Sequence, residues 1–308
     1  MCHAGDTRHA ARAIRKAIRD EDKRLRSKHA ILREENQDIV GVAIFLVALV
    51  MWSTVSMAWV YGKIGGLAAV VTNSLTISIF HEMEHDLIHD LYLKRVPVLQ
   101  HVMFFVIWIL KAGTAPWWRK RIHLQHHLQS GQVDDVEERL LGLGMPWTWK
   151  RVLVTVFASA SLLLVPDIVE EYHGFDVVDM LVWNVPMSTI STSAMVFYWT
   201  YPAIVYNVCI GFPNILRHVC LVVITTWVHY YDIPPKDVFY QTQIVDHLLL
   251  LPFQLFCFNF GATHGVHHYI TKQPFYLRQM VAPRVIPVMK EQGVRCNDLG
   301  SNVRSNRW

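Results

Sequence analysis

The chain has 308 residues, of which 52% are hydrophobic, and its mean hydropathy is positive at +0.23. Its formal net charge is only +4, and the basic residues flank apolar runs, so nothing in the composition indicates a nucleic-acid-binding protein. The five cysteines show no CxxC spacing, which argues against a disulfide framework and against a thiolate metal site. Long runs without charge instead predict an integral membrane protein.

Residues 1–38 form a highly charged segment in which both signs are mixed. Within it, apolar residues recur at helical spacing, namely Ala11, Ile14, Ile18 and Leu25. This pattern predicts a surface helix that lies against the membrane, with a solvated charged helix as the alternative. We interpret 1–38 as a separate N-terminal cytoplasmic segment.

The first charge-free run, Ile39 to Tyr61, contains 23 residues. At ~1.5 Å per residue it can cross a hydrocarbon core of ~30 Å, and it starts too late and is too long for a cleaved signal peptide. A short turn follows, and a second apolar run, Ile64 to Phe80, leads directly into His81. The two runs predict a helical hairpin that places His81 on the same side of the membrane as the N-terminus.

The later apolar runs are shorter or interrupted. Pro97 to Leu110 predicts an interfacial or re-entrant helix, whereas Val152 to Val165 predicts a short span. Met180 to Phe212 has 33 residues without a charge and contains two prolines, which predicts one kinked crossing. Two further helices, Val219–Tyr231 and Val245–Phe260, are expected in or under the membrane surface. The predicted fold class is therefore all-α and integral to the membrane, with four transmembrane helices, or six at most.

The distribution of charge predicts the orientation. Ten Lys or Arg residues precede Ile39, and none occurs from Val152 to Leu216, where five acidic residues crowd the loop from Asp167 to Asp179. The positive-inside rule places this loop outside and the basic segments in the cytoplasm. A basic cytoplasmic tail, 271–308, then follows a membrane catalytic domain at 39–270.

Three histidine clusters lie on the predicted cytoplasmic side. The pattern HxxHH occurs twice, and on a helix its members share one face, with Cβ atoms ~5–6 Å apart. A third cluster, HEMEH, supplies two histidines at i and i+4, and another histidine lies one turn further on. In chain order these residues are His81, His85 and His89, then His123, His126 and His127, then His264, His267 and His268. The clusters predict a cytoplasmic, helical, histidine-rich cap.

Neutral imidazole is the commonest side-chain ligand of metals. Eight clustered imidazoles without partners would cost on the order of the ~5–15 kcal/mol by which a whole protein is stable, so they must be hydrated, hydrogen-bonded or bound to metal. Eight or nine imidazoles exceed what one tetrahedral zinc ion can use, whereas two ions would use them all, and nitrogen ligands suit iron. His229 is a further candidate, although a lone histidine at the end of an apolar helix is more often a satisfied core residue.

Other readings of the histidines remain open. HEMEH fits the HExxH pattern of zinc proteases, in which Glu82 would be the general base, but this reading leaves both HxxHH stretches without a role. A metal transporter would need ionisable residues midway through the spans, where only Asp246 and His247 come into question. A solvated histidine-rich face is the third alternative.

The order HExxH, HxxHH, single His, HxxHH, distributed over hydrophobic hairpins, resembles the membrane-bound fatty acid desaturase and alkane hydroxylase superfamily. Glu82 to His89 and Arg121 to Glu138 resemble its bacterial acyl-desaturase-like branch, which is similar to membrane enzymes that decarboxylate fatty acids to terminal alkenes. The resemblance covers about Ile39 to Ile270. It implies that nine histidines bind two ferrous ions: His81, His85, His123, His126, His127, His229, His264, His267 and His268.

The chain departs from the family pattern at two places. Thr225 stands four residues before His229, where some desaturases have an asparagine associated with the site. The additional His89 leaves the pair His85 and His89 as an alternative ligand set, and we interpret it as a residue behind the ligands. Glu82 and Asp135 are candidates for orienting ligand imidazoles through their second ring nitrogen.

The resemblance implies an O2-dependent di-iron oxidoreductase that abstracts hydrogen from an unactivated C–H bond of a fatty acid or acyl lipid. A desaturase is expected, with oxidative decarboxylation to a terminal alkene or hydroxylation as alternatives on the same site. The electrons would come from a ferredoxin or a cytochrome b5-like protein with its reductase, docking on basic patches near Arg119 and Arg278. The expected location is among the lipids of a bacterial inner membrane.

Overall fold

The structure, a computed structural model, describes residues 4–130, 132, 135, 137–138, 145–146, 148–156, 177–229 and 237–304. In these ranges the regular elements are helices, and the only β-type contacts are the isolated bridges His229–Thr242 and Ile244–Cys296. The all-α prediction is thereby confirmed. Of the predicted span from Val152 to Val165, only residues 152–156 are described, as the end of α7 (Trp149–Val156). Of the acidic loop, only residues 177–179 are described, and His173 lies outside the described residues.

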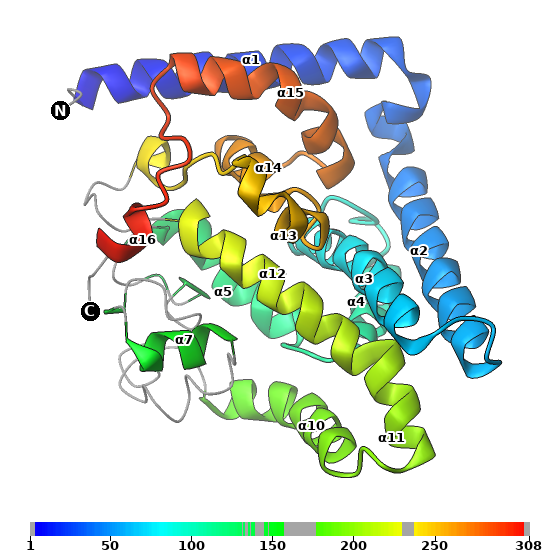
Figure 1. The fold of residues 1–308 in the computed structure, drawn as a ribbon. Helices are drawn as coiled ribbons and strands as arrows, with labels where there is room; N and C mark the ends of the chain where they lie inside the picture. The colour runs from blue at the N-terminus through cyan, green and yellow to red at the C-terminus, as the bar shows by residue number, and fades with distance from the viewer. Residues whose placement is uncertain are drawn as a thin grey trace.

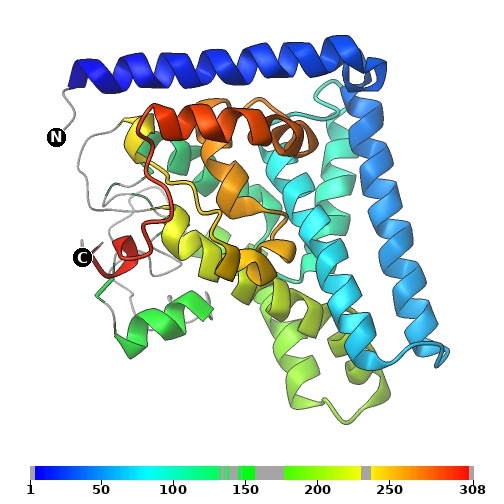
Figure 2. The ribbon, with the colours of Figure 1, turned by 45° about the horizontal axis from the view of Figure 1, so that its top comes forward.

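The predicted hairpin is present as α2 (Gln37–Val60) and α3 (Gly66–Ile88), which run antiparallel side by side (Figure 2). A buried hydrogen bond from Asn73 to Ser56, 3.1 Å long, joins the two helices where they pack. The α2 helix with the turn before it, Glu34–Val60, is one of two helices long and apolar enough to cross a membrane. The other is the continuous helix Tyr201–Val228.

The second span differs from the prediction. Met180 to Phe212 was expected to form one crossing, but the chain turns at residues 197–200, between α10 (Val177–Val196) and α11 (Tyr201–Tyr206). Pro202 lies in the first turn of α11, where its missing N–H costs nothing, so it starts a helix instead of kinking one. The helix then continues through a π-helical stretch at Asn207–Gly211 into α12 (Phe212–Val228). The separate helix expected at Val219–Tyr231 is therefore the end of this long span.

Two further pairs of helices are apolar enough to cross but are sharply bent. The pair α4 (Pro97–Lys111) and α5 (Pro116–Gln129) is bent by 97°, which agrees with the re-entrant character expected for Pro97–Leu110. The segment Leu248–Leu255, which includes α13 (Leu251–Leu255), makes an 82° bend with α14 (Phe260–Tyr269). Residues in the left-handed conformation, such as Ala112 and Asn259, interrupt the backbone at both breaks. Counting each bent pair as one span gives up to four spans.

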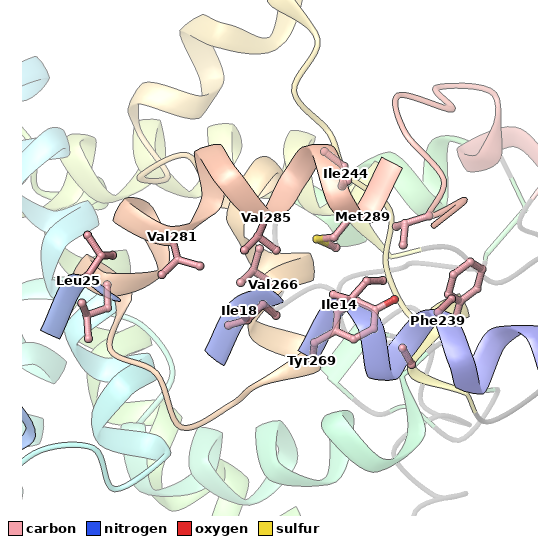
Figure 3. Packing of buried hydrophobic residues seen from close by; sticks show 14 of the residues in the cluster. Ile14, Ile18, Leu25, Phe239, Ile244, Val266, Tyr269, Val281, Val285 and Met289 are labelled. Atoms are coloured by element: carbon pink, nitrogen blue, oxygen red, sulfur yellow. The ribbon is translucent and has the colours of Figure 1, made fainter. Parts of the chain in front are cut away.

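The N-terminal helix α1 (Ala4–Lys28) packs on protein, and this corrects the expectation of a helix that lies against the membrane or in solvent. Its apolar face is buried against α14 and α15 (Phe275–Glu291), which begins four residues into the region expected to be a basic tail. Figures 1 and 2 show α1 extended beside α15. Figure 3 shows Ile14, Ile18 and Leu25 meeting Val281, Val285 and Met289 from α15. The apolar periodicity of residues 11–25 correctly predicts a helix with an apolar face, but the partner of this face is α15, a helix from the other end of the chain.

Candidate metal centre

Four helices bring the histidines together. The third helix, α3, carries His81 and His85, with His89 at its C-terminal cap, and α12 is capped by His229. The two HxxHH motifs lie on α5 and α14, so both form helices as expected. Gly261, in the first turn of α14, makes this approach possible, because a Cβ atom there would lie 2.7 Å from the carbonyl oxygen of Val245 and 2.9 Å from Ile224 of α12.

Five of these side chains form one group, which we call the five-histidine group: His85, His89, His123, His127 and His267. The Nε2 atoms of four of them form a closed ring. The distances around it are 3.2 Å from His89 to His123, 3.1 Å from His123 to His127, 3.0 Å from His127 to His267, and 3.1 Å from His267 back to His89. A neutral imidazole carries one N–H, so four nitrogens cannot fill four such contacts with hydrogen bonds.

A cation at the middle of the ring would satisfy all four nitrogens at once. If the ring were a square with these sides, its centre would lie about 2.2 Å from each Nε2 atom, close to the ~2.0–2.1 Å of a metal–imidazole bond. The Nε2 atom of His85 is also buried without a hydrogen-bond partner, as expected of a nitrogen that binds metal. The five-histidine group therefore fits a metal ion.

A second set, the four-histidine group, consists of His126, His229, His264 and His268, and all four side chains are buried. Each offers a nitrogen within 4.8 Å of the others. The Nε2 atoms of His264 and His268 are 3.0 Å apart. The two groups are neighbours, because the rings of His127 and His268 are 4.7 Å apart. The donor set is nitrogen throughout, which suits two transition-metal ions held side by side.

His81 belongs to neither of the two groups. Of the nine histidines that the resemblance assigned to metal, eight lie in the two groups, and the ninth member of the groups is His89. The alternative pair His85 and His89 is thus the one that the geometry brings together. The Nδ1 atom of His81 lies 3.3 Å from the Nζ atom of Lys111, and along α3 His81 precedes His85 by one helical turn. Among the described residues, no group of three metal ligands includes His81, so the HExxH reading finds no zinc site here.

Carboxylates behind the histidines hold their second ring nitrogen. The Nδ1 atom of His126 is 2.8 Å from Asp135, as the orienting role proposed for Asp135 requires, and the Nδ1 atom of His123 is 2.6 Å from Glu137. These contacts leave Nε2 of both rings for the groups. Burial disfavours the charged form of Glu137, but the adjacent His123 imidazole outweighs it, so the pKa of this carboxyl lies below its usual range.

Polar side chains hold two other members of the four-histidine group, and sequence reasoning missed both. The Nδ1 atom of His229 lies 3.2 Å from the Ser130 hydroxyl, and that of His268 lies 3.0 Å from the side-chain oxygen of Gln241. No spacing rule links these residues to their partners, which are 99 and 27 positions away. Thr225 is buried, and its contact with His229 is the ordinary helical one, in which the Thr225 carbonyl accepts from the His229 N–H at 3.4 Å.

Glu82 does not contact a histidine of either group. It accepts from Arg278 of α15 at 3.3 Å, and the same guanidinium lies 2.9 Å from Asp86 and 3.4 Å from Nδ1 of His85. Arg278 is 3% exposed, and Arg119 is paired with Glu84 at 3.1 Å. The docking prediction concerns the basic patches near these two arginines, and it stays a prediction, but Arg119 and Arg278 themselves are engaged inside the protein.

Asp135→Asn should weaken metal binding while the fold is kept. The amide keeps the shape of the carboxylate but loses the charge that strengthens His126 as a ligand, and loss of such a partner costs about 10–100-fold in metal affinity. Competition with a chelator, followed by metal analysis, measures the change. Asp20→Asn is the matched control. Asp20 forms an exposed ion pair with Lys16, so this variant should leave the metal affinity unaltered. Equal affinity in both variants would remove Asp135 from the site.

Comparison with known proteins adds one match. A model of the family described as fatty acid desaturase matches residues 63–300, which include every histidine of the two groups. No curated protein matches the chain.

Proposed function

This chain belongs to the fatty acid desaturase family, and on that premise we propose that it is a membrane-bound, O2-dependent di-iron oxidoreductase that desaturates a fatty acyl chain. The observation that carries the proposal is the pair of neighbouring all-nitrogen groups, one of five histidines and one of four. The mononuclear zinc site that HExxH predicts has three protein ligands, whereas this chain brings together five and four histidines in two neighbouring groups.

Two ferrous ions bound in these groups would supply the reduction of O2 and the abstraction of hydrogen from an unactivated C–H bond. Conversion of –CH2–CH2– to –CH=CH– uses one O2, two electrons and two protons and releases two water molecules. The protein's part is to fix the imidazoles. Asp135, Glu137 and Gln241 hold Nδ1 of their histidines, which keeps Nε2 directed into the groups.

The four-histidine group is shielded from bulk water, because its histidines are at most 6% exposed. In the five-histidine group His267 is fully buried, whereas His89 and His127 are partly exposed. A reactive species formed on the buried side would be protected from solvent. The apolar helices α2 and α12 give the acyl chain an approach from the bilayer. Hydroxylation and oxidative decarboxylation to a terminal alkene could use the same groups and would differ in the products.

The two electrons require an external donor. We propose a ferredoxin or a cytochrome b5-like protein with its reductase, because the sequence contains no flavin or dinucleotide glycine fingerprint and no haem attachment motif. The concentration of basic residues before Ile39 and after Ile270 supports a cytoplasmic position for the histidine groups. A bacterial inner membrane is the proposed location.

Metal content and product analysis test the proposal together. Protein purified in nanodiscs should contain iron at both groups, and with ferredoxin, its reductase, NADPH and O2 it should convert saturated fatty acids to unsaturated products seen by gas chromatography and mass spectrometry. Omission of O2 should stop product formation. Zinc in place of iron, with no O2-dependent product from any saturated fatty acid or phospholipid tested, would reject the assignment.

A further inference from the structure

A cluster of cations lies beside the five-histidine group, inside the protein. Lys111 ends α4, Arg119 lies in the first turns of α5, and Arg217 lies in α12, within the long span Tyr201–Val228. The three side chains are within electrostatic range of one another and of His81. A contact between helices fixes this proximity: Asn214, one turn before Arg217, donates to the carbonyl of Leu110 at 2.8 Å, next to Lys111.

Two of these cations are paired. Lys111 donates to Glu84, and Arg119 lies 3.1 Å from Glu84 and 3.5 Å from Glu137. Two cations thus share two carboxylates, and Glu137 also faces His123.

Arg217 forms no ion pair with either of these carboxylates. It is 6% exposed, and its Nε and Nη1 atoms are buried without a hydrogen-bond partner. Among the residues that the structure describes, no carboxylate forms an ion pair with it. Glu84 is within electrostatic range of Arg217, but its carboxylate is already bound by Lys111 and Arg119. A buried guanidinium without an ion pair of its own in a membrane span is expensive, and such charged residues commonly mark a functional site. An anionic group on a ligand would supply the missing acceptor for Nε and Nη1 of Arg217.

We propose that Arg217, with Lys111 beside it, is the seat for the carboxylate of a free fatty acid. The guanidinium fork fits a carboxylate with two parallel hydrogen bonds, and the apolar chain would lie among the membrane helices. The inference rests on the proposed function, because it names the form of the substrate. Lys111 contacts His81, one helical turn or ~5.4 Å before His85, so the carbons next to the carboxyl group would lie nearest the histidine groups.

Binding of radiolabelled dodecanoate to the iron-loaded protein in nanodiscs tests the seat, without O2 so that nothing is oxidised, and with empty nanodiscs as background. Unlabelled dodecanoate should compete about ten- to a hundredfold better than its methyl ester, because the ester cannot form charge-assisted hydrogen bonds. Equal competition by acid and ester in the unaltered protein would overturn the proposal without the need for any variant.

Variants then assign the effect to Arg217. Arg217→Met should weaken dodecanoate binding by about ten- to a hundredfold and leave ester binding the same, while Arg217→Lys should keep part of the preference for the acid. Arg12→Met, at an exposed position of α1, is the control. Arg217→Met should melt no lower than the unaltered protein, because it removes an unpaired buried charge. Unchanged acid binding in Arg217→Met would reject the seat.

The outcomes separate the two proposals. Acid-selective binding that depends on Arg217, without any O2-dependent product, would keep the seat and reject the proposed oxidation. Product formation by a protein that binds acid and ester equally would keep the oxidation and reject the seat.

Discussion

His267→Ala should abolish acyl oxidation and release metal from the five-histidine group. His267 is fully buried, and its Nε2 atom closes the ring with His89 and His127 at 3.1 Å and 3.0 Å. Loss of a residue that only orients a ligand costs about 10–100-fold, so loss of a ligand should cost more, on the order of a thousandfold in activity. Iron analysis and product formation on the same preparation measure both effects, with His9→Ala at an exposed position as the control.

The sharpest comparison is between His81→Ala and His89→Ala. The geometry puts His89 in the five-histidine group and His81 against Lys111, so His89→Ala should lose iron and His81→Ala should retain it. The opposite result would restore the ligand set that the family resemblance implied. Retention of full iron and activity by His267→Ala would break the assignment of the whole group.

Arg278→Met should destabilise the fold more than any surface substitution. Its guanidinium is the counter-charge of Glu82 and Asp86, and Asp86 also accepts from the Tyr92 hydroxyl at 2.7 Å and from the N–H of Phe275 at 2.8 Å. Removing one partner of a buried ion pair leaves an uncompensated charge and costs about 3–5 kcal/mol. Thermal unfolding in nanodiscs should show a clearly lower midpoint.

Arg284→Met is the matched control for this prediction. Arg284 lies on the same helix and also pairs with a glutamate, Glu21 at 3.3 Å, but its side chain is 63% exposed. An exposed pair contributes about 0–1 kcal/mol, so the midpoint should hardly move. Combining Arg278→Met with Asp86→Asn should recover part of the loss, since the second change removes a charge left alone by the first. Equal midpoints for the two arginine variants would show that the buried network does not hold α3 to α15.

The sequence allowed the helical class, the α2–α3 hairpin and most of the site to be predicted, because these follow from local patterns. Charge-free runs identify apolar helices, and HxxHH puts three imidazoles on one helical face. The choice between His81 and His89 could not be made in the same way. Both lie one turn from His85, so the spacing is the same, and only the position of α5 decides which of them meets His123.

Long-range partners account for the remaining differences. The apolar residues of α1 recur at helical spacing and predict an apolar face. The helix that covers this face, α15, lies more than 200 residues later in the sequence. No motif links Gln241 and Ser130 to the histidines that they contact. The sequence does not reveal that Arg278 is buried in ion pairs, because its carboxylate partners lie nearly 200 positions earlier. Pro202 starts a helix where a kink was expected, because the chain turns just before it.

The ring of nitrogens joins residues that are made at very different times. His89 and His267 touch although 178 positions separate them, and Arg278 of α15 must then close over Asp86. While the ribosome works, α2 and α3 reach the membrane long before the last histidines exist. Early chains therefore hold only part of each histidine group, and both groups can be complete only after His268 of α14 has been made.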